Sequence, residues 1–376
     1  MLLLSGPNMG GNELKYITEC IETGWVSSVG AYVDRFEKMS AEFAGTKYAV
    51  ATSSGTAALH ICLMMAGVNE NDYVIAPNIT FVATINAIKY TGASPVLIDI
   101  DEKNWQLDLD LLEEFLTNET VQEKDTCYHK KTGKRIPVIM PVHVLGNMCD
   151  MDRLLALAQK HHLTVIEDST EALGSYYKGC HAGSMGLLGT FSYNGNKIIT
   201  TGGGGMIVTN DEALAKKAKH LTTQAKSDPF EYTHDTIGYN YRLVNISAAM
   251  GVAQMEQLPD FLKRKKEIIE FYKTSLNGIS DIEFQEVSDE VSPNWWLPTI
   301  KTAHQKKILK ALNENKMQSR PFWVPMNQLS MFANDIYFNH NDRSDFLYKH
   351  CLSIPCSTNI TIEQLQAVSD KIKEVF

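Results

Sequence analysis

The stretch Thr190–Met206, which reads TFSYNGNKIITTGGGGM, places Lys197 between a strand-like run and four consecutive glycines. Most lysines are solvated surface residues, but this one is followed directly by two isoleucines. Burial disfavours the charged form of a lysine, and a neutral amine can attack a carbonyl carbon. The glycines allow another segment or a ligand to approach the backbone closely. The stretch therefore predicts a nucleophilic lysine at a ligand site.

Two upstream patterns could complete such a site. Residues 53–56, Ser-Ser-Gly-Thr, follow a strand-like run and open a helical stretch, so free N–H groups at the helix start could bind an anion. A plain helix N-cap by a serine is the alternative. The apolar run Leu163–Ile166 is followed by Glu167 and Asp168, and Glu171 lies three residues beyond Asp168. Here the alternative is an Asp that caps the next helix, with Glu171 as its capping-box partner.

The three patterns together suggest one cofactor, pyridoxal 5'-phosphate. This cofactor needs an anion site for its phosphate, a lysine for its aldehyde and an acid beside its pyridine nitrogen. The anion site would be formed by Gly55 and Thr56, the lysine would be Lys197, and the acid would be Asp168. No cluster with the spacing of metal ligands accompanies them, so we expect no metal.

Apolar runs alternate with helical patterns through the first two thirds of the chain, which predicts βαβ units, an α/β fold and a largely parallel sheet. Such a sheet binds ligands at the carboxyl ends of its strands. A long charged helix, Ile246–Leu276, should be kinked or restarted at Pro259. We place the boundary there, with a large domain at 1–250 and a small C-terminal domain at 251–376. The polar segment 117–136 is expected to be a surface excursion. The predicted strands are Tyr48–Thr52, Val74–Pro77, Pro95–Asp99, Val138–His143, Leu163–Ile166, Thr190–Tyr193 and Met206–Thr209, and the predicted helices include Ala57–Met65, Phe81–Tyr90, Met151–Lys160 and Thr361–Val375.

Composition excludes several classes of protein. The 376 residues are 44% hydrophobic and 21% charged, which is ordinary for a globular chain, and the net charge of -9 argues against a broad surface for nucleic acid or anionic lipid. Seven cysteines without a CxxC motif favour a reducing compartment. No apolar run reaches the roughly 20 residues that a membrane crossing requires. We therefore expect a cytoplasmic protein that binds neither membrane nor nucleic acid.

The chain resembles the DegT/DnrJ/EryC1/StrS family of sugar aminotransferases, which are fold type I pyridoxal-phosphate enzymes. The resemblance implies a large cofactor-binding domain with a mostly parallel mixed sheet between helices, plus a smaller C-terminal α/β domain. Several long matches in one order are more specific than any single motif. They are Phe36-Glu37, Ser54–Leu59, Pro77–Thr84, Pro95–Asp99, Pro141–His143, Asp150–Asp152, Glu167-Asp168, Phe191–Met206, Gly238–Arg242 and Arg320-Pro321.

The resemblance also implies roles. Lys197 binds the cofactor aldehyde and moves the proton during transfer, and Asp168 pairs with the pyridine nitrogen. Phe81 stacks on the ring, and Glu171 lies beside it at a position that varies in the family. Phosphate ligands would be Gly55, Thr56 and Ser192, together with Asn240 from the neighbouring subunit. The active unit would therefore be a homodimer with shared active sites.

Similarity to one branch of the family implies the substrates, which are L-glutamate and a UDP- or GDP-linked 4-keto-6-deoxy sugar with a 2-acetamido group. The new amine would be placed at C4, for surface or glycoprotein glycans. The candidate substrate-binding residues are Asn8, Met9, Trp25, His181 and Arg320. Met326-Asn327 departs from the family pattern of Leu-His or Met-His, which could alter the sugar pocket. Trp295, Trp296 and Trp323 are expected in core or interface packing.

Three other readings remain open. Some relatives carry histidine in place of the lysine and catalyse dehydration, so a sugar dehydratase is the nearest rival, although Lys197 favours transamination. A regulator that binds the cofactor without catalysis is the second. The third is a Rossmann dehydrogenase, against which the absence of GxGxxG after an early strand argues.

Overall fold

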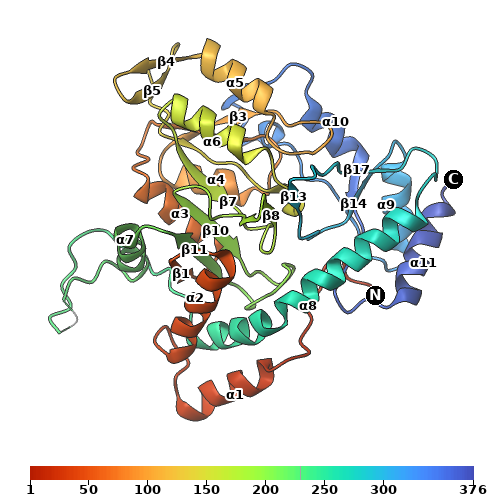
Figure 1. The fold of residues 1–376 in the computed structure, drawn as a ribbon, viewed down its shortest axis with the longest axis horizontal. Helices are drawn as coiled ribbons and strands as arrows, with labels where there is room; N and C mark the ends of the chain where they lie inside the picture. Colours follow the sequence, from red (N-terminus) through yellow and green to blue (C-terminus); the bar gives the residue numbers. More distant parts are fainter. Residues whose placement is uncertain (229) are drawn as a thin grey trace.

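The computed structural model describes residues 1–228 and 230–376, and it places an eight-stranded sheet at the centre of the larger part of the molecule (Figure 1). Seven strands run parallel, and only β11 is reversed, since it pairs antiparallel with both of its neighbours. In spatial order the strands are β1 (Tyr48–Thr52), β11 (Gly205–Thr209), β10 (Leu188–Ser192), β7 (Thr164–Asp168), β6 (Val138–Ile139), β2 (Tyr73–Pro77), β3 (Ser94–Ile98) and β16 (Ile336–Phe338).

Helices cover both faces of this sheet, because its central strands are apolar on both sides. In β2, Val74 and Ala76 pack into a core with α3, α4 and α7, whereas Tyr73 and Ile75 pack into a second core with α5 and α6. Alternate side chains of a strand point to opposite faces, so one apolar run serves two layers. The helices are α3 (Gly55–Met65), α4 (Ala83–Tyr90), α5 (Leu109–Asn118), α6 (Met151–Lys160) and α7 (Glu212–Thr222).

One helix, α8 (Asn245–Ser275), connects the two parts of the molecule (Figure 1). Its 31 residues span about 46 Å at the standard rise. It contacts α1 (Glu13–Thr23) and α2 (Ala31–Ala44) as well as α11 (Ile362–Lys373). Pro259 lies inside this single helix, so the expected restart there does not occur. The predicted boundary between residues 250 and 251 falls within α8, and the division into two domains stays a prediction.

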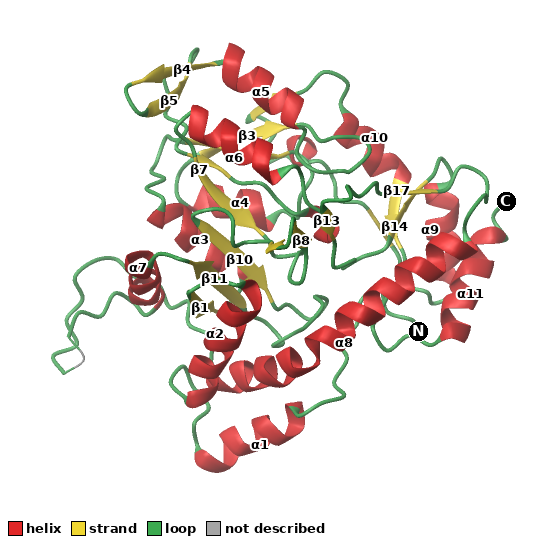
Figure 2. Ribbon diagram, viewed as in Figure 1, coloured by secondary structure: helices red, strands yellow, loops and turns green. Residues whose placement is uncertain are grey.

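The C-terminal part contains a four-stranded antiparallel sheet, with β14 and β17 close to α9 in Figure 2. Its strands in order are β12 (Glu283–Phe284), β14 (Thr299–Lys301), β17 (Cys351–Ser353) and β15 (Arg320–Pro321), and α9 spans Gln305–Glu314. The N-terminal segment is bound to this part. The Leu2 N–H donates to the Lys316 carbonyl at 2.9 Å, and the Leu4 carbonyl accepts from the Cys356 N–H at 2.7 Å.

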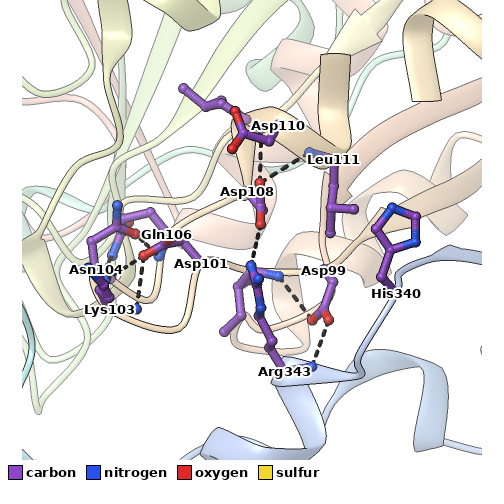
Figure 3. A network of polar contacts seen from close by, with 12 residues as sticks. Asp99, Asp101, Lys103, Asn104, Gln106, Asp108, Asp110, Leu111, His340 and Arg343 are labelled. Carbon is purple, nitrogen blue, oxygen red and sulfur yellow. Dashed lines mark hydrogen bonds and ion pairs between the residues drawn. The ribbon is translucent and has the colours of Figure 1, made fainter. Parts of the chain in front are cut away.

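Helix α10 (Arg343–His350) is capped by a carboxylate from the large sheet (Figure 3). Asp99 directly follows β3, and its Oδ2 accepts from the Arg343 N–H at 2.7 Å while its Oδ1 accepts from the N–H and the hydroxyl of Ser344. The residue before the helix, Asp342, makes no capping bond. The Arg343 guanidinium also pairs with Asp108 at 2.7 Å. These bonds fasten the C-terminal part to the sheet edge where β16 joins β3.

The remaining elements are short. The polar segment 117–136 contains the hairpin of β4 (Thr120–Glu123) and β5 (Thr126–His129). A three-stranded sheet comprises β13 (Val291–Ser292), β8 (Tyr176–Tyr177) and β9 (Cys180–His181), and two short 3₁₀ turns are η1 (Val144–Gly146) and η2 (Met326–Gln328). Among residues 1–228 and 230–376, no helix has both the length and the apolarity needed to cross a membrane.

Candidate active site

A cavity of about 400 Å³ lies at the carboxyl edge of the large sheet, where the strand ends meet the C-terminal part. β1, β2, β7 and β10 each end at this edge and lead into a loop or helix that reaches the cavity. Seven of the residues predicted for the site line it, namely Gly55, Thr56, Phe81, Asp168, Ser192, Lys197 and Arg320.

The start of α3 forms one wall of the cavity. The Ser54 hydroxyl caps the helix by accepting a hydrogen bond from the Ala57 N–H at 3.1 Å. This is the serine N-cap that was considered as an alternative from the sequence. The first-turn N–H groups of Gly55 and Thr56 belong to the positive end of the helix dipole. A Cβ on Gly55 would come within 2.9 Å of the Ser192 side chain, so only glycine fits here without a shift. This wall can therefore bind an anion close to the backbone.

Asp168 ends β7 as a buried carboxylate with 1% of its surface exposed. Its Oδ2 accepts from the Thr84 hydroxyl at 2.7 Å, and its Oδ1 accepts from the Thr170 hydroxyl at 2.7 Å and from the Thr170 N–H at 3.2 Å. The bond to Thr170 has the local form of the helix cap considered from the sequence, but the carboxylate also lines the cavity. The threonines fix its orientation, so it can meet a cationic ligand atom.

Lys197 lies in the turn that follows β10, where its backbone N–H donates to the Asn194 carbonyl at 3.0 Å. Its side chain is half-buried, and burial lowers the pKa of its amine, although the charges of Glu171 and Asp168 oppose this shift. Its Nζ lies 3.8 Å from the centroid of the Trp296 ring. A lysine in this setting is closer to its neutral, nucleophilic form than a surface lysine.

Glu171 is buried behind the cavity and borders a small void that it shares with Lys197. One of its carboxylate oxygens accepts from the Leu145 N–H at 2.8 Å. Burial raises the pKa of Glu171, and the nearby Lys197 amine opposes that rise. Lys197 and Glu171 therefore border the same void, and each opposes the effect of burial on the pKa of the other.

The comparisons with known proteins agree with this geometry. The model of the DegT/DnrJ/EryC1/StrS aminotransferase family matches residues 7–373. The chain belongs to this family. GDP-perosamine synthase of Escherichia coli O157:H7 is 38% identical over 98% of this chain and 97% of its own length, and that of Vibrio cholerae is 33% identical over 100% and 99%. The crystal structure of S. venezuelae DesV superposes with a TM-score of 0.86 at 26% identity, covering 96% of this chain and 94% of DesV.

Membership of the DegT/DnrJ/EryC1/StrS family makes this protein a pyridoxal-phosphate-dependent aminotransferase with the α/β fold expected from the sequence. The cavity fits that cofactor. The N-terminus of α3 and Ser192 offer donors for a phosphate, Asp168 offers a carboxylate, and Lys197 offers an amine. The close packing around Gly55 keeps side chains out of the phosphate position.

The other predicted residues lie outside the described cavity lining. Asn240 is exposed on the loop that leads into α8, and Trp25 and Met9 are exposed to 58% and 48%. The Asn8 amide donates to the Thr358 hydroxyl at 3.2 Å. Within this chain these residues do not line the cavity that Lys197 lines, and their roles stay predictions.

His181 is placed differently from the expectation. Its ring is buried among Phe43, Tyr176 and Phe191, and it does not line the cavity. Its Nε2 accepts from the Gly174 N–H at 2.8 Å and its Nδ1 donates to the Ala182 carbonyl at 2.6 Å. Burial lowers the pKa of His181 to about 4. With both ring nitrogens bonded to backbone, this histidine supports the local chain and has no nitrogen left for a ligand.

Two features of the site go beyond what was expected from the sequence. Trp296 is buried in the core and Trp323 packs against it, as expected, but the two rings also stack with 6.4 Å between their centroids and both line the cavity. The Asn327 of the unusual Met326-Asn327 pair forms a clamp with Asn78. The Asn78 amide donates to Asn327 Oδ1 at 2.9 Å, and the Asn327 N–H donates to Asn78 Oδ1 at 3.0 Å. Asn78 precedes Phe81 by three residues, so the clamp ties that cavity wall to the C-terminal part.

Proposed function

We propose that this protein transfers an amino group from L-glutamate to the C4 ketone of a nucleotide-linked 4-keto-6-deoxyhexose. The observation that supports this most strongly is the meeting of Lys197, Asp168 and the start of α3 at one cavity. When bound there, pyridoxal 5'-phosphate carries the amino group between the two substrates and withdraws electrons from the reacting carbon.

The residues of the chain divide the remaining work. Gly55, Thr56 and Ser192 would hold the phosphate, and the buried Asp168 carboxylate would hold a proton on the ring nitrogen by its opposite charge. Lys197 would bind the aldehyde and then move the proton at the carbon that gains or loses the amine. Phe81, which is 54% exposed in the cavity wall, would cover one ring face.

Among nucleotides, GDP is favoured by the relatives. Three of them, 33% to 38% identical to this chain, are named GDP-perosamine synthase, and GDP-perosamine is a GDP-linked 4-amino sugar. The 2-acetamido group and the use in surface or glycoprotein glycans rest on the branch resemblance alone. We therefore propose a GDP-linked sugar and keep the acetamido sugars as a comparison.

We propose further that the active unit is a homodimer in which Asn240 reaches the partner's cofactor. Asn240 is exposed, and its loop also exposes Phe230 and Ile237 to 90% and 80%. Large apolar side chains at such exposure are candidates for burial against a second copy. Arg320, whose guanidinium donates to the Ser319 carbonyl at 3.3 Å beside the cavity, would bind an acidic group of a substrate.

A panel experiment tests the proposed reaction. The purified protein is incubated with L-glutamate and the 4-keto sugars of GDP, UDP and dTDP, with and without a 2-acetamido group, and the products are weighed by mass spectrometry. We expect exchange of the ketone oxygen for an amine, fastest on the GDP sugar. Loss of a hydroxyl without glutamate would instead support the dehydratase. Failure of borohydride to fix the cofactor to Lys197 would reject the proposal.

A further inference from the structure

Trp296 contacts Lys197 by two separate routes. The face of its indole lies 3.8 Å from Lys197 Nζ, measured to the ring centroid. Its ring nitrogen, Nε1, donates to the carbonyl of Asn196 at 2.7 Å, one residue before the lysine. The same side chain therefore touches the reactive amine and holds the backbone from which that amine extends.

The position of Trp296 is itself fixed by two buried polar residues. Asn294 accepts from the Trp296 N–H at 2.9 Å, and its amide donates to the carbonyls of Glu171 and Leu173, both at 2.9 Å. On the other side, the Trp296 carbonyl accepts from the ammonium of Lys265 at 2.8 Å.

Lys265 is unusual because it is 1% exposed and is bonded to neutral groups. Besides Trp296, its Nζ donates to the Cys356 carbonyl at 2.8 Å and lies 3.2 Å from the Cys356 sulfur and 3.4 Å from the Ser5 hydroxyl. A buried ammonium is costly unless its donors are all used. Lys265 therefore joins the N-terminal segment, α8, the turn at Trp296 and the segment after β17 at one point.

We propose that Trp296 is a positioning residue for Lys197, because its indole face attracts the free amine whenever that amine is protonated, and that Lys265 sets the place of that indole. The inference rests on the proposed role of Lys197. A cation is attracted to the negative face of an indole, most strongly when water is excluded. The other charged groups near the amine are Asp168 at the end of β7 and Glu171 three residues beyond it, and Arg320 lines the same cavity. An amine that is held in this way stays within reach of the carbon it must protonate.

The test measures the amine directly and uses neither sugar nor glutamate. Full-length protein freed of its cofactor is pulse-labelled with acetic anhydride from neutral to alkaline pH. Peptide mass spectrometry then compares acetylation of Lys197 with that of the exposed Lys38 as an internal reference. The pH midpoint of labelling gives the pKa of the Lys197 amine, and the labelling rate at high pH gives its accessibility.

Trp296→Met keeps apolar bulk but removes the aromatic face. We expect it to lower the Lys197 midpoint by about half a pH unit to one pH unit. Trp296→Phe keeps a face and should shift the midpoint less than half as far. Trp323→Met is the matched control, since Trp323 lines the same cavity and stacks on Trp296 but is not the ring in contact with Nζ. An unchanged or raised midpoint in Trp296→Met, or an equal fall in Trp323→Met, would overturn the proposal.

Lys265→Met tests the second step. We expect the Lys197 midpoint to fall as in Trp296→Met, with no additional fall when the two changes are combined. Additive shifts would show that Lys265 acts by another route and would overturn that step. If Lys265→Met does not fold, Lys265→Arg replaces it, because a longer cation must displace the Trp296 carbonyl and so should shift the midpoint in the same direction. A wrong substrate assignment leaves all these midpoints unaffected, so the two proposals fail separately.

Discussion

Lys197 is half-buried, its amine lies over the Trp296 indole, and the carboxylates of Glu171 and Asp168 lie near it. We expect Lys197→Ala to abolish amino transfer from glutamate and to prevent borohydride from fixing the cofactor to the protein. The variant should remain folded, because the side chain is half-buried in a turn and makes no ion pair among the described residues. Product mass, borohydride labelling and circular dichroism measure these outcomes.

Lys178→Ala is a suitable control, since Lys178 pairs with Asp152 and Glu290 on the surface, away from the cavity. Its turnover should match that of the unmodified protein. Amino transfer at the normal rate by Lys197→Ala would remove the lysine from the mechanism.

His181 gives a prediction about pH and stability. Burial lowers its pKa from 6.5 to about 4, so the folded state favours the neutral ring. The stabilisation that the neutral His181 ring gives to the folded state is therefore complete above pH 6.5. It is lost as the pH falls toward 4, which lowers the free energy of unfolding by up to about 3 kcal/mol. We expect the difference in unfolding free energy between the unmodified protein and His181→Gln to narrow over that range. Urea unfolding at a series of pH values measures it.

A gap between the unmodified protein and His181→Gln that stays constant from pH 6.5 to pH 4 would contradict the assignment of a buried neutral ring.

At the level of elements, the cap of α10 by Asp99 can be tested. Asp99→Asn keeps the size of the side chain but replaces one acceptor oxygen with a donor, which faces an N–H of the helix start (Figure 3). We expect a loss of about 1–3 kcal/mol in unfolding free energy, because a buried donor is left unpaired. Asp110→Asn is the control, because the Asp110 carboxylate is 86% exposed and pairs with Arg153 on the surface. It should change the free energy of unfolding by less than about 0.5 kcal/mol. Equal effects in urea unfolding would refute the capping role.

Elements with strong local signals were predicted well. Helix α6 has the predicted bounds, Met151–Lys160, because Asp150 caps the Arg153 N–H and apolar residues follow at helical spacing. β16 was missed, because its three half-buried residues become a strand only by pairing with β3, far away in sequence. β6 spans only Val138–Ile139 of the predicted Val138–His143, although Val142 beyond it still pairs with Asp168 as an isolated parallel bridge.

In the site, too, residues with a local sequence signal were predicted, whereas contacts between distant segments were not. Gly55, Asp168 and Lys197 carry recognisable chemistry in their own segments, and the structure brings them to one cavity, while their roles stay predictions. Trp296 could not be found in this way, because its contact with Lys197 depends on a segment about a hundred residues further on and on the buried Lys265. His181 was misjudged because the backbone groups that bond its ring, at Gly174 and Ala182, carry no signal in the sequence.

For the whole molecule, the proposed sharing of active sites predicts complementation between two inactive variants. Lys197→Ala lacks the amine, and Asn240→Asp places a negative charge where the partner's phosphate is expected. In a mixed dimer, one site receives both intact residues. After unfolding and refolding together, an equal mixture should recover about a quarter of the normal activity. Each variant refolded alone is the control, and no recovery in a mixture that forms dimers would contradict the shared site.

The helix α8 also decides how the chain can be divided. Its N-terminal half buries side chains against α1 and α2, and its C-terminal half buries them against α11. A gene cut at the predicted boundary, after codon 250, would separate the first turns of this helix from the rest and leave apolar stripes uncovered on both products. We therefore expect the two fragments to be insoluble when expressed apart and to be rescued by co-expression, whereas a nick in the exposed hairpin turn between β4 and β5 should be tolerated.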